Sequence, residues 1–351
     1  MTTIAAVHGV LGAHRYPQAE LTDLFTRLCL PDDDRAAAVA RRLHASTMVD
    51  TRHLALPAER YPDLVGFTEA NDAFLAVAVE LGAQAVAGAV KEAGLDVTDV
   101  DLIMSTTVTG IAVPSLDARI AGRLGLRPDV RRVPLMGLGC VAGAAGLARV
   151  HDYLRGAPEA VAVLVSVELC SLTVQRDDRS VANMVACGLF GDGAAAVVLT
   201  GADRAMPGPR IVGSLSHLYP DTERAMGWDV GTSGLRIVLG SEVPDLVREY
   251  LAGDVAALLA EQGLNVADID PWICHTGGPK VIEAIEQVLD LPPDALALTW
   301  RSLREVGNLS SASVLHVLRD TLAARPAEGD RWGVLLAMGP GFCAELVLIR
   351  W

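Results

Sequence analysis

Two spacings of apolar residues alternate along the chain and together predict a layered α/β protein. Residues 70–94 and 115–125 carry apolar side chains at helical spacing, and the first of these stretches ends at Gly94. The short apolar runs VDLIMSTTV (100–108) and AVAVLVSVEL (160–169) have the length of buried strands, and we expect 132–136 to be extended. Strands that alternate with helices favour sheets covered by helices.

The second half of the chain repeats this order of elements. It predicts a helix at 243–263, a strand in DPWICHTGG, a helix in GGPKVIEAIEQVLDLP, and a loop followed by a helix in GNLSSASVLHVLRDTLAARP (307–326). Each half ends with a glycine turn between apolar runs, in GLFGDGAAAVVL and in LLAMGPGFCAELVL. We therefore expect two similar halves, 1–200 and 201–351, which meet in the Gly- and Pro-rich segment 200–210.

Length and composition narrow the possible classes of protein. A chain of 351 residues exceeds the roughly 250–300 residues that one hydrophobic core supports. Apolar residues make up 51% and aromatic residues 4%, so Ala, Val, Leu and Ile must fill the core. The net charge of −14, without a Lys/Arg stripe, argues against nucleic-acid binding. No uninterrupted apolar run reaches the roughly 18 residues of a membrane span, and the N-terminus is a poor signal peptide.

The six cysteines point to a reduced protein without a cysteine-based metal site. They are scattered along the chain and form no CxxC pair. We therefore expect a cytoplasmic protein with neither disulfides nor a bound metal.

One of these cysteines has the surroundings of a nucleophile. Cys140 lies in GLGCVAGAAG, where a glycine loop enters an apolar helix. Free N–H groups and the positive end of the helix dipole would face the sulfur there, which favours the thiolate and a lowered pKa. The alternative is a cysteine that packs as a small apolar residue.

Two polar residues of the second half are candidates for partners of Cys140. His275 ends an apolar strand and precedes Thr276-Gly277-Gly278, so it can project from the strand end into a cavity. Asn308 lies in GNLSS, just before an apolar helix. Taken singly, the histidine is compatible with an ordinary turn and the asparagine with a helix cap.

In this order, GLGCVAGAAG, LFGDGAAA, HTGGPKVI, EVGNLSSASVL and MGPGF resemble the type III polyketide synthases, the chalcone-synthase-like family, over essentially the whole chain. The resemblance looks closest to bacterial members that make alkylpyrones or alkylresorcinols. It implies a thiolase-like fold of five αβαβα layers, a homodimer, and iterative decarboxylative condensation of an acyl-CoA starter, most simply a long-chain one, with malonyl-CoA or methylmalonyl-CoA. No metal or organic cofactor is implied.

The resemblance also implies a role for each candidate catalytic residue. Cys140 would attack the starter thioester and hold the growing chain, and His275 would stabilise the thiolate. Asn308 and His275 would bind the carbonyl of malonyl-CoA while it loses carbon dioxide, and hydrogen-bond donors of this kind change rates by roughly 10²–10³ each.

Further positions match the family's pocket and its CoA site. Phe190 matches a gatekeeper between the CoA tunnel and the cavity, Ile237 a second gatekeeper, Thr173 a pocket-lining threonine, and Val113 a residue that reaches into the partner's site. The implied CoA contacts are Arg41, Arg42, Gly277 and Gly278. Gly339, Pro340 and Gly341 correspond to the family's cyclisation loop, which this sequence enters with Ala337-Met338.

One group of residues bears on ring closure. Val108 stands where aldol-forming members use a threonine in a Thr–Glu–Ser network, and Glu168 and Ser310 match the other two positions. A hydroxyl missing at Val108 would favour lactonisation to a pyrone.

Two other functions remain open at this point. The first is an initiating 3-ketoacyl-acyl-carrier-protein synthase, with the same fold and the same Cys/His/Asn order. Those enzymes usually carry His-Gln-Ala-Asn where this chain has His275-Thr276-Gly277-Gly278. The second is a catalytically silent protein that binds acyl-CoA or a partner synthase, against which the complete set of Cys140, His275 and Asn308 argues.

Overall fold

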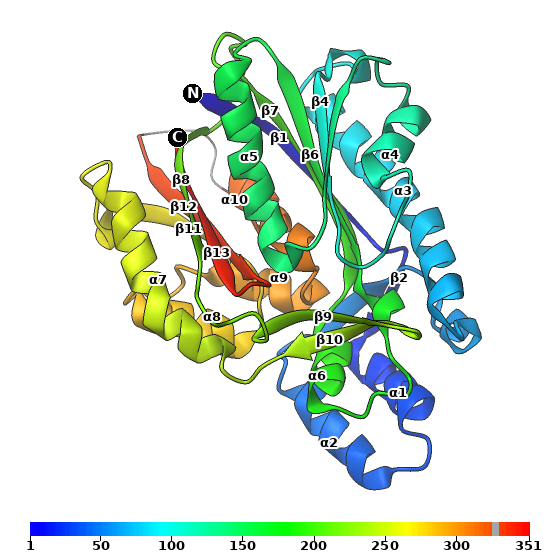
Figure 1. The fold of residues 1–351 in the computed structure, drawn as a ribbon. Coiled ribbons are helices and arrows are strands. Elements are labelled where there is room, and N and C mark those ends of the chain that lie inside the picture. Colours follow the sequence, from blue (N-terminus) through cyan, green and yellow to red (C-terminus); the bar gives the residue numbers. More distant parts are fainter. Residues whose placement is uncertain (325–329) are drawn as a thin grey trace.

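The computed structural model describes residues 1–324 and 330–351, and a single nine-stranded mixed sheet organises them (Figure 1). The strand order is β11-β12-β13-β8-β1-β7-β6-β4-β5. The strands are β1 (Thr2–Leu11), β4 (Leu102–Thr106), β5 (Arg131–Leu135), β6 (Val161–Leu169), β7 (Asp192–Thr200), β8 (Arg210–Leu218), β11 (Ile269–Cys274), β12 (Trp332–Gly339) and β13 (Cys343–Arg350). Two small antiparallel sheets pair β2 (His14–Pro17) with β3 (Thr51–Leu54), and β9 (Met226–Gly231) with β10 (Gly234–Leu239).

Helices cover the outer sides of this sheet, and further helices lie between its two halves. They are α1 (Gln18–Cys29), α2 (Asp34–Ala45), α3 (Phe67–Glu92), α4 (Leu116–Leu124), α5 (Ala142–Gly156), α6 (Val181–Leu189), α7 (Val243–Ala260), α8 (Pro279–Val288), α9 (Ala297–Val306) and α10 (Ser313–Ala324). Helix α3 packs on β1, β6 and β7, and α7 packs on β8 and β13. Between them, α5 and α10 contact strands of both halves of the sheet (Figure 1). The layers are therefore αβαβα, as predicted.

The central position of α5 explains its small residues. Most of its side chains are buried, because β4 and β6 lie on one side of it and β12 and β13 on the other. A Cβ at Gly146 would lie 2.5 Å from Leu164 Cδ1, and one at Gly143 would lie 2.3 Å from the carbonyl oxygen of Ser311. A side chain at Gly143 would collide with backbone, and one at Gly146 would displace the packed Leu164 side chain, so glycine at both positions lets the helix fit closely between two layers.

The two halves share a local motif as well as an order of elements. A 3-10 turn with a capping box precedes β4, where Asp96 and Asp99 hold each other's backbone N–H. The same device precedes β11, formed by Asn265 and Asp268. The central helix of the first half is α5 and that of the second is α10, so Cys140 and Asn308 come before equivalent helices.

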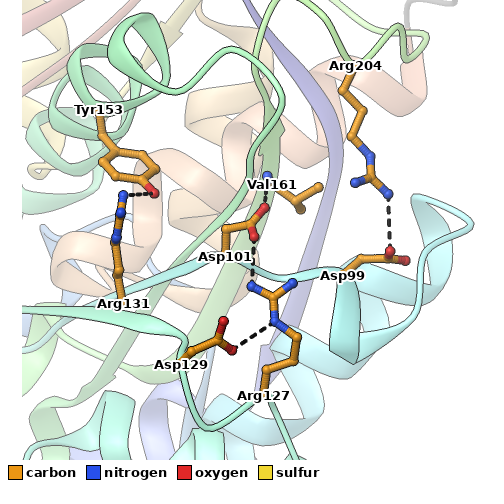
Figure 2. Close-up of polar contacts among 8 residues, drawn as sticks. All are labelled: Asp99, Asp101, Arg127, Asp129, Arg131, Tyr153, Val161 and Arg204. Atoms are coloured by element: carbon orange, nitrogen blue, oxygen red, sulfur yellow. Dashed lines mark hydrogen bonds and ion pairs between the residues drawn. The ribbon is translucent and has the colours of Figure 1, made fainter.

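Polar contacts stabilise the first half of the sheet where β4, β5 and β6 begin (Figure 2). Asp101 precedes β4, and its carboxylate accepts from Val161 N at the start of β6 and from Arg127 Nη2, both at 2.8 Å. The other pairs drawn there are Arg127 with Asp129, Arg131 with Tyr153, and Asp99 with Arg204. These contacts fix the first residues of β4, β5 and β6. The candidate site residues Val108 and Glu168 lie at the opposite ends of β4 and β6.

Most predicted elements lie where the sequence placed them, within a few residues. Helix α3 is apolar and long enough to cross a membrane by length and composition, with half of its most apolar stretch buried. It packs against three strands, which is the role of a core helix. The last predicted turn of α10, at Arg325 and Pro326, lies outside the described residues.

Candidate active site

The candidate nucleophile lies at the entrance to the central helix. Cys140 belongs to a 3-10 turn, Gly139–Val141, that leads directly into α5, and its side chain is buried. Gly139 has φ +54, and a Cβ there would lie 2.7 Å from Pro340 Cδ. The loop can approach the Gly339–Gly341 turn this closely only with glycine at that position.

His275 and Asn308 reach the same place from the second half. His275 directly follows β11, and its N–H donates to the carbonyl of Leu336 on β12 at 3.0 Å. Asn308 follows Gly307, and its backbone pairs with Phe190 in an isolated bridge. The two side chains meet, with Asn308 Nδ2 3.4 Å from His275 Nε2. All three candidate catalytic residues line one cavity.

Hydrogen bonds fix the orientation of the Asn308 amide. Its Oδ1 accepts from the N–H of Ser310 at 2.7 Å, and the hydroxyl of Ser313 lies 3.4 Å away. The Nδ2 donor is therefore left to face His275 and the cavity. A neutral His275 next to this donor carries its proton on Nδ1, which has no hydrogen-bond partner among the described residues.

Burial sets the charge state of the resting site. It raises the pKa of Cys140 to about 12, an effect that the thiol's contact with Ser310 Oγ at 3.7 Å opposes. It also lowers the pKa of His275 to about 3. Burial thus acts against the lowered cysteine pKa expected from the helix terminus, because a charged sulfur loses its hydration here. The closed site favours a neutral thiol and a neutral imidazole.

The cavity has about 1460 Å³ of free space, part of it open to solvent. Most of the pocket residues expected from the sequence line it. They are Cys140, His275, Asn308, Ser310, Phe190, Ile237, Thr173, Val108, Pro340 and Gly277.

The other expected residues lie away from the cavity wall. Gly278, Gly339 and Gly341 support the loops around it. Val113 is 89% exposed on the surface. Arg41 and Arg42 are exposed on α2, where Arg41 lies 3.7 Å from Asp23.

The network around Glu168 differs from the one expected. Its carboxylate is fully buried, and the Oε1 atom accepts a 2.5 Å hydrogen bond from Ser311, not from Ser310. Oε2 accepts from Thr109 Oγ1 at 2.9 Å and from the backbone N–H of Val108 at 3.1 Å. The assignment of Ser310 to this network is therefore wrong, and Ser310 contacts the Cys140 thiol instead. Hydroxyls are present on both sides of the carboxylate, so the argument for a pyrone from a missing one loses its basis.

Sequence reasoning missed the inner lobe of the cavity. Its wall is formed by α1, α6 and the strand β3, and the residues concerned include Leu21, Leu24, Phe25, Leu28, Arg52, Leu54, Tyr61, Ala186 and Cys187. One signal was available in the sequence. In TRHL, the alternation of a strand places Arg52 on the same buried face as Leu54.

A cysteine, a histidine and an asparagine that line one cavity can carry out acyl transfer through a thioester. The cysteine accepts the acyl group, and the imidazole and amide are placed to bind a developing oxyanion. In a five-layered αβαβα protein, this arrangement defines a thiolase-like acyltransferase.

Comparison with known proteins names the family. The chain matches the model of the chalcone and stilbene synthases, with residues 1–204 in the N-terminal domain and residues 210–351 in the C-terminal domain. It is 56% identical to a 1,3,6,8-tetrahydroxynaphthalene synthase of Streptomyces peucetius subsp. caesius, over 100% of this chain and 93% of the relative. It is 32% identical to the phloroglucinol synthase of Pseudomonas fluorescens, over 100% and 99% of the two chains.

Solved structures agree with this result. The crystal structure of 1,3,6,8-tetrahydroxynaphthalene synthase from Streptomyces coelicolor A3(2), a bacterial type III polyketide synthase, superposes with a TM-score of 0.93 at 33% identity and covers 99% of each chain. The chain belongs to the chalcone and stilbene synthase family and is a type III polyketide synthase, a Claisen-condensing acyltransferase. Enzymes of this family act on CoA thioesters without a further cofactor.

Proposed function

We propose that this enzyme makes 1,3,6,8-tetrahydroxynaphthalene from malonyl-CoA alone. The observation that carries the proposal is the 56% identity, over the whole chain, to a synthase of that product. The expectation of an alkylpyrone or alkylresorcinol finds no support among the relatives compared, which include the tetrahydroxynaphthalene and phloroglucinol synthases.

The stoichiometry of the product fits iterative condensation. Tetrahydroxynaphthalene, C10H8O4, contains five two-carbon units. Five malonyl-CoA molecules supply them with loss of five carbon dioxide, five CoA and one water, so no oxidant or reductant is needed.

The geometry supports a division of labour among the three catalytic residues. Cys140 passes its proton to His275 as the sulfur attacks the first thioester, because burial of both groups disfavours a separated charge before substrate arrives. That proton leaves on the CoA thiolate, and His275 is neutral again when malonyl-CoA enters. In the tautomer protonated at Nε2, the imidazole then donates from Nε2. Together with Asn308 Nδ2, which lies 3.4 Å from that atom, it binds the oxygen of the enolate formed by decarboxylation.

Other residues are proposed to admit substrate. Phe190, directly after α6, and Ile237, on β10 of the hairpin β9–β10, both line the cavity and would act as its gatekeepers. Gly277 and Gly278 precede α8, where the absence of side chains leaves room for CoA. Arg41 and Arg42, exposed on α2, would meet its phosphates.

We also propose that the enzyme is a homodimer. Val113 is 89% exposed and Met136 is 58% exposed, which leaves apolar surface that a second subunit would cover.

The inner lobe supports a second candidate, a long-chain acyl-CoA starter. Its wall is mostly aliphatic, from Leu21, Leu24 and Leu28 of α1 and Val174 beyond β6. An alkyl chain in such a lobe would gain about 0.8 kcal/mol per buried methylene.

Incubation with malonyl-CoA alone, followed by mass spectrometry, tests the main proposal. We expect C10H8O4 from the wild type and none from Cys140→Ala. If malonyl-CoA alone gives nothing and added long-chain acyl-CoA gives pyrones or resorcinols, the second candidate replaces it. Product formed only with an acyl-carrier protein would instead indicate the initiating ketoacyl synthase.

A further inference from the structure

Arg52 is a buried cation on the wall of the inner lobe. It lies on the short strand β3, whose side chains alternate between partly exposed and buried, and it is 4% exposed. The Arg52 side chain lines the same cavity as Cys140, although the two residues lie on different elements of the fold.

The contacts of Arg52 leave its charge without a paired anion. Nε donates to Gln18 Oε1 at 2.9 Å, and Nη1 donates to the carbonyl of Phe190 at 2.8 Å. Both acceptors are neutral. Within residues 1–324 and 330–351, no carboxylate lies within ion-pair distance of the guanidinium, and Nη2 has no hydrogen-bond acceptor.

The one carboxylate that acts on Arg52 from a distance is already engaged. Asp192 accepts from the N–H of Ala55 at 2.6 Å and of Ser171 at 2.8 Å, and also from the Ser171 hydroxyl. Burial lowers the pKa of Arg52 to about 10, so the guanidinium still carries its charge at neutral pH. A buried charge of this kind is costly unless an anion meets it.

Most of the remaining wall of the lobe is apolar, with the Tyr61 hydroxyl bound to Ser171. Leu21, Leu24 and Leu28 face it from α1, and Cys187 faces it from α6. An aliphatic passage with one cation in its wall fits a chain that is uncharged along its length and ends in an anion. A planar guanidinium with a free N–H edge is suited to a carboxylate.

We propose that Arg52 binds the carboxylate at the far end of an acyl chain held on Cys140. The substrate class is an acyl group with a terminal carboxylate, as in a polyketide chain primed by malonyl-CoA. This inference rests on the proposed function. Anchoring the chain at both ends, by the thioester and by the ion pair, restricts which interior carbons approach one another for ring closure.

Matched acyl-CoA pairs test this proposal at the loading step alone. Hexanedioyl-CoA differs from hexanoyl-CoA by a carboxylate in place of the terminal methyl group. In loading, the Cys140 sulfur forms a thioester with the acyl carbon, the bond to CoA breaks, and the thiol proton leaves on CoA. Intact-protein mass spectrometry follows the rate for each, using the butyryl/butanedioyl and octanoyl/octanedioyl pairs as a length series.

We expect the wild type to favour the carboxylate-ended member at one length of the series. Arg52→Met lowers the ratio of the two rates at that length at least tenfold while hexanoyl loading stays within twofold, and Arg52→Lys retains part of the preference. Arg15→Met is the matched control, since Arg15 is exposed on the paired strand β2.

Three results would contradict the inference. They are a wild type that loads both members of each pair equally, unchanged rates for both substrates in Arg52→Met, and an equal loss for both substrates, which would mean a purely structural role. The wild-type length series still tests the inference where Arg52→Met does not fold. A wild type that loads none of these groups and also forms no product from malonyl-CoA would overturn the proposed function itself.

Discussion

The buried carboxylate of Glu168 makes the stability of this enzyme depend on pH in a way that one substitution removes. Glu168 stands near the end of β6 with no exposed surface, and burial raises its pKa from the ordinary 4.5 to about 7 despite the hydrogen bonds from Ser311, Thr109 and Val108. Folding therefore favours the protonated carboxyl. Glu168→Gln is close in shape and is neutral at every pH.

The sign and size of the effect follow from proton linkage. Below about pH 4.5 the carboxyl is protonated in both the folded and unfolded states, so burial carries no ionic penalty. The penalty grows as the pH rises from 4.5 to about 7, because only the unfolded state releases its proton in that range. It is complete above that, where both states are ionised. At about 1.4 kcal/mol per pKa unit, the full penalty is about 3 kcal/mol.

Thermal unfolding of the wild type and of Glu168→Gln, compared at each pH, measures this ionic penalty. The stability of Glu168→Gln relative to the wild type should rise by about 2–3 kcal/mol between pH 5 and pH 8. With an unfolding entropy of about 2.1 cal/mol/K per residue, this is a relative gain of about 3–4 °C in Tm. A constant offset of about 1 kcal/mol from the lost acceptor does not change with pH.

Glu159→Gln makes the same chemical change at an exposed position just before β6 and serves as the control. Parallel pH profiles for Glu168→Gln and the wild type would refute the reasoning, since they would mean that Glu168 ionises in the folded state as readily as in the unfolded chain.

Three further predictions concern the catalytic loop, the decarboxylation step and the dimer. Asn308→Ala should lower malonyl-CoA decarboxylation by about 10²–10³ while acyl loading on Cys140 survives, and loss of loading with normal decarboxylation would contradict the proposed role. Gly139→Ala should destabilise the protein by at least about 1–2 kcal/mol, because φ is +54 and the new Cβ would lie 2.7 Å from Pro340 Cδ; an unchanged Tm would count against this. Val113→Asp should convert the proposed dimer to monomer in light scattering, and an unaltered mass would place the interface elsewhere.

The positions of the candidate catalytic residues were predictable because local sequence determines where they stand. Glycine at 139 and small residues after Cys140 indicate a tight turn into a packed helix, and His275 follows an apolar run of strand length. The ends of strands and the starts of helices meet at the same edge of an α/β layer, so these positions converge. The structure shows the convergence directly in the contact of Asn308 with His275.

Neighbouring hydroxyls were harder to assign. Ser310 and Ser311 are adjacent in the sequence, yet only Ser311 bonds to Glu168, while Ser310 meets the Cys140 thiol. Ser310 has φ +49 at the start of a 3-10 turn, and this backbone conformation decides which of the two side chains faces which partner. A pattern of residue types does not contain that information.

By itself, the sequence determined the alternation of strands and helices, the two similar halves and the positions of Cys140, His275 and Asn308, because each depends on spacing within a few residues. Only the tertiary structure decided the pKa direction at Cys140, the partner of Glu168 and the burial of Arg52. These properties depend on desolvation and on contacts between distant segments, as when Gln18 and Phe190 enclose a strand arginine that the sequence shows only as a charged residue.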